Sequence, residues 1–529
     1  MERARLRRRV LALVVLFGVI FRLYFFVGLV SGDPQDDGVY YLNALAISKD
    51  GPRYLERYRN LAPDFLANPI DQFNFRPMTT YPISLAFKVL GPGETAAVLW
   101  SLACSALSIP VVYGVAALLG GPSAGLLAAV LLAVYPLDVV LATRILSDGP
   151  LGFLCGLGIL GVMTAESRVA GRRSVPAWLA GVAFGLAYLA NPRALLVLGF
   201  VVVLVKIKGV PSDRGWHVPV PVLLGFGAVF FLEAATYFWT TGQPFLNLRI
   251  HNGANTFKYL NEPSSAWRLG LLDVHFTNGR PLQLLQTVFH LRQGPTDHVG
   301  LYFFLFAAGV ADAVIRRRHL FIAVLGVGLF AFLEFGFVGV HWNASNRLLE
   351  YWMVFKQERF LAILTVPLIA LAACSLARVA PRQPLAVAAV LVLLTASSVQ
   401  AIEKTRTFYR AGLSDLRAIA DDVLSQPRRT FHTDPWAETH LRLFTQHRAD
   451  NLRSMNRDDA PYTEPDACII VGGSRGIELL ANYVESGMPA WARQLAALGQ
   501  PPPDWQLIRS VSGPRTVQRR GDLRIYCRS

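Results

Sequence analysis

The sequence predicts a mainly α, polytopic membrane protein of 529 residues that ends in a small α/β domain. Three observations predict this class. Apolar runs long enough to cross a bilayer recur along most of the chain. Only 16% of the residues are charged, and the mean hydropathy is +0.38. Clusters of lysine and arginine separate pairs of these runs. A chain of this composition places its apolar residues in lipid as well as in a protein core.

Eleven apolar runs are long enough, or nearly so, to span a bilayer at roughly 20 residues per crossing. They lie at 10–30, 96–119, 124–142, 149–165, 175–190, 194–208, 218–240, 299–315, 319–340, 360–377 and 384–401. The first run follows a basic segment like that of a signal peptide, but it is long and no small-residue cleavage site follows it. We therefore interpret it as a retained helix and expect about eleven transmembrane helices.

The basic clusters predict the orientation of the chain, because lysine and arginine are retained in cytoplasmic loops. The clusters lie on one side of the membrane when the eleven runs are threaded in order; they are Arg3 to Arg9, Arg168/Arg172/Arg173, Lys206/Lys208/Arg214, Arg316 to Arg318 and Arg378/Arg382. The N-terminus is thus expected in the cytoplasm of a plasma or inner membrane, and the chain after residue 401 outside it. The net charge of +15 mostly reflects this topology and does not indicate a nucleic-acid partner.

Two long loops, 31–95 and 241–298, are expected on the outer side as part of a transmembrane domain that covers 1–401. Within the first loop, 37–48 and 54–66 carry apolar residues at helical spacing beside charged residues. This pattern predicts amphipathic helices that lie on the membrane. The apolar segment 78–90 is too short for a crossing and is expected to be an interfacial or re-entrant helix.

Residues 402–529 are less hydrophobic and are expected to form a soluble α/β domain outside the membrane. Short apolar strands alternate there with helices, at 430–433, 438–446, 467–472, 477–485, 505–511 and 523–527. Cys468 and Cys527 are the two cysteines outside apolar helices, and an oxidising compartment would permit a disulfide between them. The sequence has no CxxC motif or His-rich spacing, so a structural zinc site has no support.

Polar residues gather in the outer loops of the predicted topology. Asp36 and Asp37 follow the first apolar run, and their mutual repulsion beside a low-dielectric bilayer would raise the pKa of one of them unless cations compensate. The other outer residues of this kind include Arg76, Arg144, Asp148, Asn191, Arg193, Arg347, Lys356 and Arg359. Solvated loop acids are the alternative interpretation of the pair, but the gathering of acids and arginines on one side favours a polar site at the outer leaflet.

Charged residues also fall inside apolar runs, where ionisation costs on the order of 3 kcal/mol. Arg22, Glu233 and Glu334 are the clearest examples, and each is expected to face the bundle interior. Arg22 could form a structural ion pair with Glu233 or Asp148, or it could contact a substrate.

Carboxylates combined with arginines suit the transfer of a group from a lipid phosphate to a hydroxyl. A carboxylate can take the proton from the attacking hydroxyl. Guanidinium groups can stabilise the departing phosphate through forked hydrogen bonds. An amphipathic roof over the site would exclude water, which otherwise competes with the acceptor.

Four motifs resemble those of the GT-C glycosyltransferases, in the branch of the protein O-mannosyltransferases and the lipid A aminoarabinose transferases. Residues 36–46 resemble the branch's Asp-Glu-x-x-Tyr-x-x-x-Ala motif, with Asp37 in place of glutamate. Residues 75–81 resemble its Lys-Pro-Pro-Leu-Tyr segment, with Arg76 in place of lysine and Met78 in place of the second proline. Residues 144–148 are similar to its Arg-x-x-x-Asp/Glu element, and 358–367 to its Arg-Tyr-Leu-x-x-x-x-Pro helix.

The resemblance implies an inverting transfer of a sugar from a polyprenyl-phosphate donor to a lipid, glycan or protein hydroxyl. Asp36 matches the general base, with Asp37 as its orienter or an acceptor contact and Asp148 as a supporting acid. The implied phosphate-binding residues are Arg76, Arg359 and Arg193, and the implied substrate contacts are Tyr40, Arg144 and Tyr81. The resemblance implies no metal and no cofactor, although the paired acids leave Mg²⁺ or Mn²⁺ open.

A transporter or flippase for a lipid-linked or anionic substrate is the main alternative, because polar residues in a helical bundle also mark substrate pathways. The unequal long loops and the surface position of the acids argue against matched transporter repeats. A membrane scaffold that presents residues 402–529 is a weaker alternative, since it would not need Asp36, Arg76 and Asp148 on one face. The sequence leaves the sugar and the acceptor open.

Overall fold

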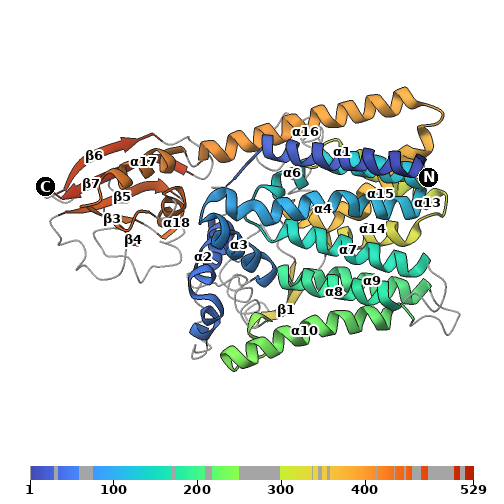
Figure 1. Cartoon of the computed structure of the whole chain (residues 1–529), viewed down its shortest axis with the longest axis horizontal. Helices are drawn as coiled ribbons and strands as arrows, with labels where there is room; N and C mark the ends of the chain where they lie inside the picture. The colour runs from blue at the N-terminus through green and yellow to red at the C-terminus, as the bar shows by residue number, and fades with distance from the viewer. Residues whose placement is uncertain are drawn as a thin grey trace.

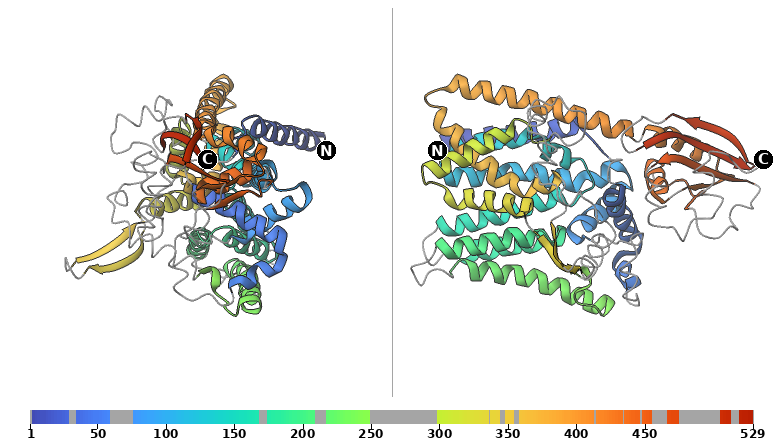
Figure 2. Two further views of the ribbon diagram at one scale, coloured as in Figure 1. Left: turned by 90° about the vertical axis from the view of Figure 1, so that its left-hand side faces the viewer. Right: turned by 180° about the vertical axis from the view of Figure 1, so that it is seen from behind.

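The computed structural model describes residues 2–28, 34–58, 76–167, 174–208, 217–248, 298–335, 337–343, 348–353, 358–412, 414–433, 435–445, 448–454, 466–474, 505–512 and 519–528. Most of these residues are helical, and the long helices lie side by side in one bundle (Figure 1). The N-terminus lies at one end of the bundle and a small β-sheet at the other (Figures 1 and 2).

The predicted apolar runs correspond to helices along the described chain. These are α1 (Glu2–Tyr24), α4 (Glu94–Gly120), α5 (Pro122–Ala133), α6 (Pro136–Ala142), α7 (Asp148–Ser167), α8 (Ser174–Ala190), α9 (Ala194–Lys208), α10 (Pro219–Thr241), α13 (Tyr302–Ile315), α14 (Leu320–Phe335), α15 (Thr365–Val379) and α16 (Pro384–Gly412). Pro136 begins α6 and removes a backbone donor there, and the axis bends by 58° between α5 and α6.

The chain is an integral membrane protein. Five segments of the described chain are long and apolar enough to cross a bilayer, and the bent pair α5 and α6 could form a sixth. The outer helices carry exposed apolar side chains. Trp239 of α10 is 80% exposed, and Leu385 of α16 is 85% exposed. Such surfaces suit contact with lipid rather than water. The expected count of about eleven crossings stays a prediction.

One predicted run ends in a strand. The run 319–340 forms α14 only as far as Phe335, and Phe337 begins strand β1 (Phe337–Asn343), which pairs antiparallel with β2 (Leu348–Met353). Periodicity alone misassigned the end of this run, because a short apolar stretch fits a strand as well as a helix.

Three short helices lie across the end of the bundle that is remote from the N-terminus (Figure 1). They are α2 (Pro34–Asp50), the 3₁₀ helix η1 (Gly51–Tyr58) and α3 (Pro77–Leu90). The predicted helices 37–48 and 78–90 coincide with α2 and α3. Residues 54–58 of the predicted helix 54–66 belong to η1, and residues 59–66 lie outside the described part of the chain.

The chain after α16 forms a mixed sheet of order β4-β3-β5-β7-β6 with two helices. The strands are β3 (Thr430–Thr433), β4 (Leu452–Ser454), β5 (Ala467–Ser474), β6 (Trp505–Val511) and β7 (Arg519–Arg528), and the helices are α17 (Ser414–Ser425) and α18 (Pro435–Phe444). Sequence analysis missed α17 and the three-residue β4. The expected boundary at 401/402 falls inside α16, and the predicted element 477–485 lies outside the described residues.

A disulfide joins Cys468 to Cys527, as predicted. The two residues lie opposite each other in β5 and β7, which pair antiparallel. The bond therefore links two positions that are 59 residues apart in sequence. The other three cysteines, Cys104, Cys155 and Cys374, are free and buried.

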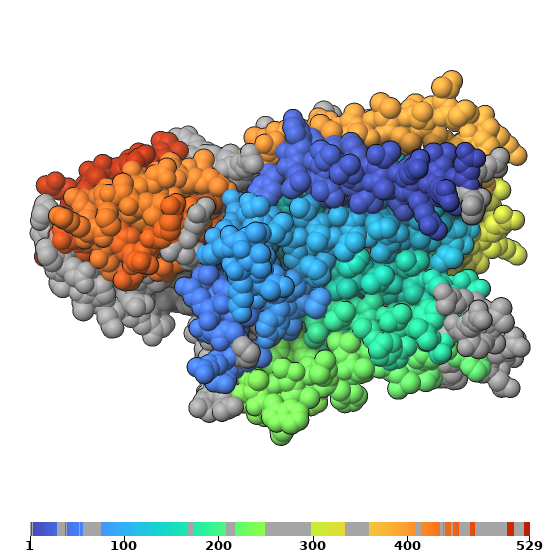
Figure 3. Space-filling view, in the orientation of Figure 1, coloured from blue at the N-terminus to red at the C-terminus, as the bar shows by residue number. Residues whose placement is uncertain are grey.

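The C-terminal sheet and its helices pack on the end of the bundle that carries α2 (Figure 3). Helix α18 contacts α2 directly. Arg417 of α17 donates two hydrogen bonds to the carboxylate of Glu94 at the start of α4, at 3.0 and 3.1 Å. Its guanidinium group also lies 4.2 Å from the centre of the Phe444 ring of α18. The same residue thus contacts the bundle and the C-terminal helices.

Glycines bring α8 and α10 into backbone contact. A Cβ atom at Gly181 would lie 2.0 Å from the carbonyl oxygen of Val222, and one at Gly225 would lie 2.1 Å from that of Trp178. Small residues allow this close approach between membrane helices. The contact fixes the spacing of two helices that border the candidate site described below.

The buried charge of Arg22 is paired with Asp138 of α6, at 2.5 Å, and not with Glu233 or Asp148, the two partners that the sequence analysis named beside a substrate contact. Arg22 is fully buried and also donates to Ser105, Gly18, Ala133 and Leu132. The bend between α5 and α6 turns Asp138 toward α1, and the sequence carries no signal for this geometry. The prediction that Arg22 faces the bundle interior is confirmed.

We predict that Arg22→Leu lowers the free energy of unfolding by about 3–5 kcal/mol, because Asp138 would stay buried without its counter-ion. Thermal unfolding of the purified protein in detergent measures this loss. The double variant Arg22→Leu/Asp138→Leu serves as the control and should recover most of the stability. A single variant as stable as the double variant would contradict the structural importance of the pair.

Candidate active site

Charged side chains from distant segments meet where α2 and α3 cover the end of the bundle. Asp37 lies in the first turns of α2, and Arg76 directly precedes α3. Arg144 and Asp148 flank the turn between α6 and α7, as predicted. Arg193 lies in the turn between α8 and α9, and Arg359 lies in the 3₁₀ helix η7 (Glu358–Leu364) before α15.

Asp37 is fully buried and forms an ion pair with Arg144, whose Nη2 lies 3.1 Å from Asp37 Oδ1. The side chain of Arg144 is only 8% exposed. A buried carboxylate needs such a partner, because the loss of water otherwise penalises its charge. The pair fixes α2 against the turn between α6 and α7.

Asp148 lies between two guanidinium groups. Arg193 Nη1 donates to Asp148 Oδ1 at 2.9 Å, and Arg359 Nε lies 3.9 Å from Asp148 Oδ2. The ring of Phe360 lies under both arginines, with its centre 3.3 Å from Arg193 Cζ and 5.9 Å from Arg359 Cζ. One carboxylate and one aromatic face therefore hold two cations in place.

Arg193 interacts electrostatically with Arg359 and Arg76 as well as with Asp148. Burial is the main cause that lowers the pKa of Arg193, to about 10, and the two neighbouring arginines lower it further while Asp148 raises it. Arg193 therefore stays protonated at neutral pH. Among the described side chains, Arg193 therefore lies near two further guanidinium groups and the carboxylate of Asp148, an arrangement that could hold an anion.

A chain of polar contacts supports this region. The hydroxyl of Tyr40 lies 3.4 Å from Ser147 Oγ, to which Asn191 Nδ2 donates at 3.1 Å. The backbone N–H of Arg193 in turn donates to Asn191 Oδ1 at 3.1 Å. Sequence analysis placed Asn191 in this turn without a role and overlooked Ser147. Only the fold brings α2, α7 and the turn after α8 together.

The side chain of Asp36 lies outside the described part of the structure. Its backbone belongs to α2, one residue before Asp37. Among the described residues, no group of three or more His, Cys, Asp and Glu side chains could hold a metal ion. The expectation of metal-independent chemistry stays a prediction.

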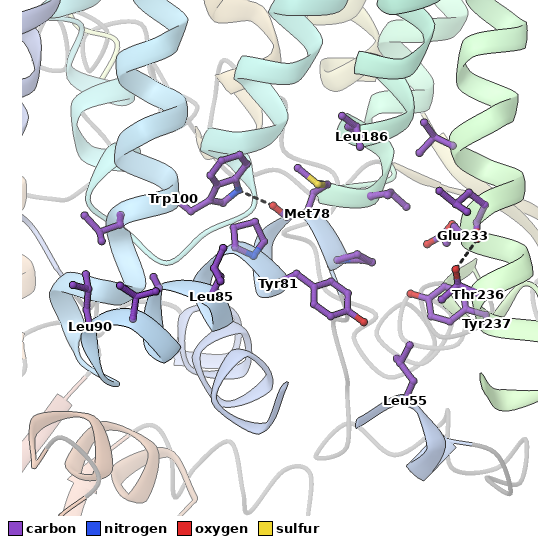
Figure 4. Close-up of a pocket in the computed structure, with 18 residues that line it drawn as sticks. Leu55, Met78, Tyr81, Leu85, Leu90, Trp100, Leu186, Glu233, Thr236 and Tyr237 are labelled. Atoms are coloured by element: carbon purple, nitrogen blue, oxygen red, sulfur yellow. Dashed lines mark hydrogen bonds between the residues drawn. The ribbon is translucent and has the colours of Figure 1, made fainter. Parts of the chain in front are cut away.

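A groove of about 870 Å³, groove A, lies between α3, α4, α8 and α10 (Figure 4). Pro77 and Met78, which follow Arg76, line it, and the indole of Trp100 donates to the Met78 carbonyl at 2.6 Å. Most other lining residues are apolar and include Leu85, Leu90, Leu186, Leu189, Leu232 and Val229. The predicted contact residue Tyr81 is 38% exposed and also lines the groove.

Glu233 lines groove A and accepts a hydrogen bond from Asn247 Nδ2 at 2.9 Å. Glu233 is half-buried, at the edge of the groove (Figure 4). Tyr188 lies close enough to Glu233 and Arg76 to interact electrostatically with both. Groove A therefore combines a long apolar wall with the carboxylate of Glu233, and the residues that follow Arg76 line it, an arrangement that suits an amphiphile.

Residues 74–239 match the family model of dolichyl-phosphate-mannose-protein mannosyltransferases. The fold is similar to ArnT from Cupriavidus metallidurans in the apo state, with a TM-score of 0.59, 14% identity and 98% of each chain covered. ArnT bound to undecaprenyl phosphate gives 0.56, 13% identity and coverage of 98% of this chain and 97% of that one. No curated protein shows significant sequence similarity to the chain.

The oligosaccharyltransferase of Archaeoglobus fulgidus, solved with a tethered acceptor peptide, is also similar. Its TM-score is 0.56 at 13% identity, with 90% of this chain and 71% of that chain covered. The arabinofuranosyltransferase AftD from Mycobacteria gives 0.51 at 14% identity, with 99% and 40% covered. These similarities confirm the resemblance to the GT-C superfamily, and they show its fold.

We predict that Asp148→Asn lowers the free energy of unfolding by about 3–5 kcal/mol, because Arg193 and Arg359 lose the anion between them. Thermal unfolding in detergent checks this. Glu403→Gln, which removes a more exposed partner of Arg406, is the control and should cost no more than about 1 kcal/mol. Equal effects of the two variants would contradict the assignment of Asp148 as the anchor of the arginines.

Proposed function

We propose that the protein is a membrane glycosyltransferase that moves a sugar from a polyprenyl-phosphate donor to a hydroxyl acceptor. The observation that carries this proposal is the electrostatic interaction of Arg193 with Arg76 and Arg359, in a region where Arg76 directly precedes two residues that line groove A. An isoprenoid chain fits the apolar wall, and a phosphate fits the guanidinium groups. The match to the mannosyltransferase model and the undecaprenyl phosphate bound by ArnT support the same donor class.

In the proposed reaction, the carboxylate of Asp36 takes the proton of the acceptor hydroxyl as its oxygen attacks the anomeric carbon of the sugar. The bond between this carbon and the phosphate oxygen breaks, and polyprenyl phosphate leaves with the electron pair. Arg76, Arg193 and Arg359 stabilise the added negative charge on that phosphate. A single displacement inverts the configuration at the anomeric carbon.

Asp37 and Asp148 have positioning roles in this mechanism. Asp37 is paired with Arg144, so it holds α2 and thereby places the adjacent Asp36. Asp148 holds Arg193 and Arg359 together and oriented while the donor site is empty. Binding energy is then not spent on gathering these two cations.

The proposed enzyme acts at the outer face of the membrane. The N-terminus and the basic turns between α13 and α14 and between α15 and α16 lie at the opposite end of the bundle from α2 and α3 (Figures 1 and 2). By the positive-inside bias, the basic end faces the cytoplasm. The arginine cluster and the C-terminal sheet would then face the outside, where a disulfide persists.

Mass spectrometry of glycolipids and glycoproteins tests the proposal in cells with the gene, without it, and with the Asp36→Asn variant. We expect one glycan to disappear with the gene and to stay absent with Asp36→Asn, because loss of a general base costs about 10²–10⁴ in rate. Asp50→Asn, an exposed acid at the far end of α2, is the control and should restore the glycan. An Asp36→Asn protein that restores it fully would remove Asp36 from the mechanism.

Replacing Arg76, Arg193 or Arg359 singly with glutamine should raise the KM for the polyprenyl-phosphate sugar by about 10- to 100-fold, because a hydrogen bond to a charged group contributes about 1.5–3 kcal/mol. Initial-rate kinetics in detergent with varied donor measure this change. Arg316→Gln alters an arginine of the basic turn after α13 and is the control for lost charge. An equal rise in KM for Arg316→Gln would argue against a specific phosphate site.

A further inference from the structure

A second apolar groove, groove B, is lined by other helices than groove A. It has a volume of about 430 Å³ and lies between α13, α14 and the segment η7–α15. Its wall follows α13 from Val299 to Val314, about 22 Å at 1.5 Å per residue. This length exceeds one leaflet of the hydrocarbon core, which is about 15 Å. Groove B can therefore hold a fully extended acyl chain.

Groove B approaches the arginine cluster through η7. Leu361 and Leu364 line the groove, while Arg359 and Phe360 immediately precede them in the same 3₁₀ helix. Arg359 is paired with Asp148, and the Phe360 ring lies against Arg193. An amphiphile with its chain in groove B would thus place its head group next to the proposed donor phosphate.

Grooves A and B are separate. Groove A is lined from η1, α3, α4, α8 and α10, and groove B from the residues before α6 and from α13, α14, η7 and α15. The two share no lining residue. Each nevertheless has lining residues next to an arginine of the cluster in sequence, Pro77 after Arg76 for groove A and Leu361 after Arg359 and Phe360 for groove B. Both arginines interact with Arg193.

We propose that groove B binds the acyl chain of the acceptor, so that the acceptor is a membrane lipid with a hydroxyl in its head group. This inference rests on the proposed function. Transfer from one lipid-linked donor to a protein or a soluble glycan requires one groove for an isoprenoid chain. Two chain-sized grooves that converge on one charged centre fit two amphiphilic substrates, with the larger groove A for the long isoprenoid chain.

Two neighbouring alanines of α13 provide a matched test. Ala307 and Ala308 are both exposed, but only Ala307 lines groove B. Ala307→Trp should fill the groove, whereas Ala308→Trp adds the same side chain beside it. Ala86→Trp in α3 fills groove A in the same way.

The binding experiment uses two photoactivatable probes on the full-length protein, and peptide mass spectrometry locates the cross-links. The probes are phosphatidylglycerol with a diazirine in one acyl chain and a polyprenyl phosphate with a diazirine in its chain. We expect the phospholipid to label α13 and α14, with at least a five-fold loss in Ala307→Trp and none in Ala308→Trp. The polyprenyl probe should label α3 and α10, lose its cross-links in Ala86→Trp, and keep them in Ala307→Trp as evidence of folding.

The same variants are compared in cells by mass spectrometry of the lipid and protein fractions. We expect the transferred sugar on a lipid, with at least a ten-fold reduction in Ala307→Trp and a normal amount in Ala308→Trp. Sugar found only on protein or on a soluble glycan, polyprenyl labelling of both grooves, or equal loss of phospholipid labelling in both variants would overturn the lipid acceptor while leaving the proposed function intact. No transferred sugar on lipid, protein or glycan with the unaltered protein would instead overturn the proposed function.

Discussion

The burial of ionised groups at the end of a membrane bundle is the constraint on which this structure depends. Asp37 and Asp148 are almost completely shielded, and each faces at least one arginine. An isolated charge in such a place would cost several kcal/mol, so the fold must bring its partners to it. The ion pair Arg22–Asp138 follows the same rule inside the bundle. Charge pairing and apolar packing therefore together determine which helix ends meet.

This constraint explains why the candidate site is assembled from turns. Membrane helices are stiff and apolar, so charged side chains accumulate at their ends, where α6 meets α7 and α8 meets α9. Close glycine contacts between α8 and α10 fix the spacing of the frame. The C-terminal sheet adds a further support, because α18 packs on α2 and Arg417 joins the C-terminal helices to α4. A segment distant in sequence thus contacts the helix that carries Asp36 and Asp37.

In the proposed reaction, Arg193 and Arg359, which Asp148 holds, and the neighbouring Arg76 form a preorganised receptor for phosphate, and the two grooves provide room for chains. Solvation by lipid is the reason that such grooves can exist, since an apolar cleft of this length would collapse or aggregate in water. In the proposed reaction, substrates reach the charged centre by lateral movement in the membrane. The polar chemistry then takes place where water is scarce and the guanidinium groups act most strongly.

The sequence alone determined the membrane class, the positions of most helices, and the groups that carry the site. The length of an apolar run and the placement of charges indicate whether a segment lies in lipid or in water. Both are local properties of the sequence. The assignment of Cys468 and Cys527 to an outer segment, where an oxidising compartment permits a disulfide, predicted their bond, and the register of β5 and β7 places them opposite each other. The motifs around Asp37, Arg76, Asp148 and Arg359 identified the residues that the fold brings together.

Only the tertiary structure decided the partners. Arg22 is paired with Asp138 because α6 bends, and nothing in the spacing of these residues signals that bend. Arg144 is paired with Asp37 across 107 positions of sequence, and the Ser147–Asn191 contact and the Phe360 platform are equally non-local. Strand β1 at the end of a helical run and the two converging grooves also depend on neighbours from elsewhere in the chain. The sequence gives the type of each side chain directly, whereas the pairing of charged side chains depends on distances that exist only after the helices pack.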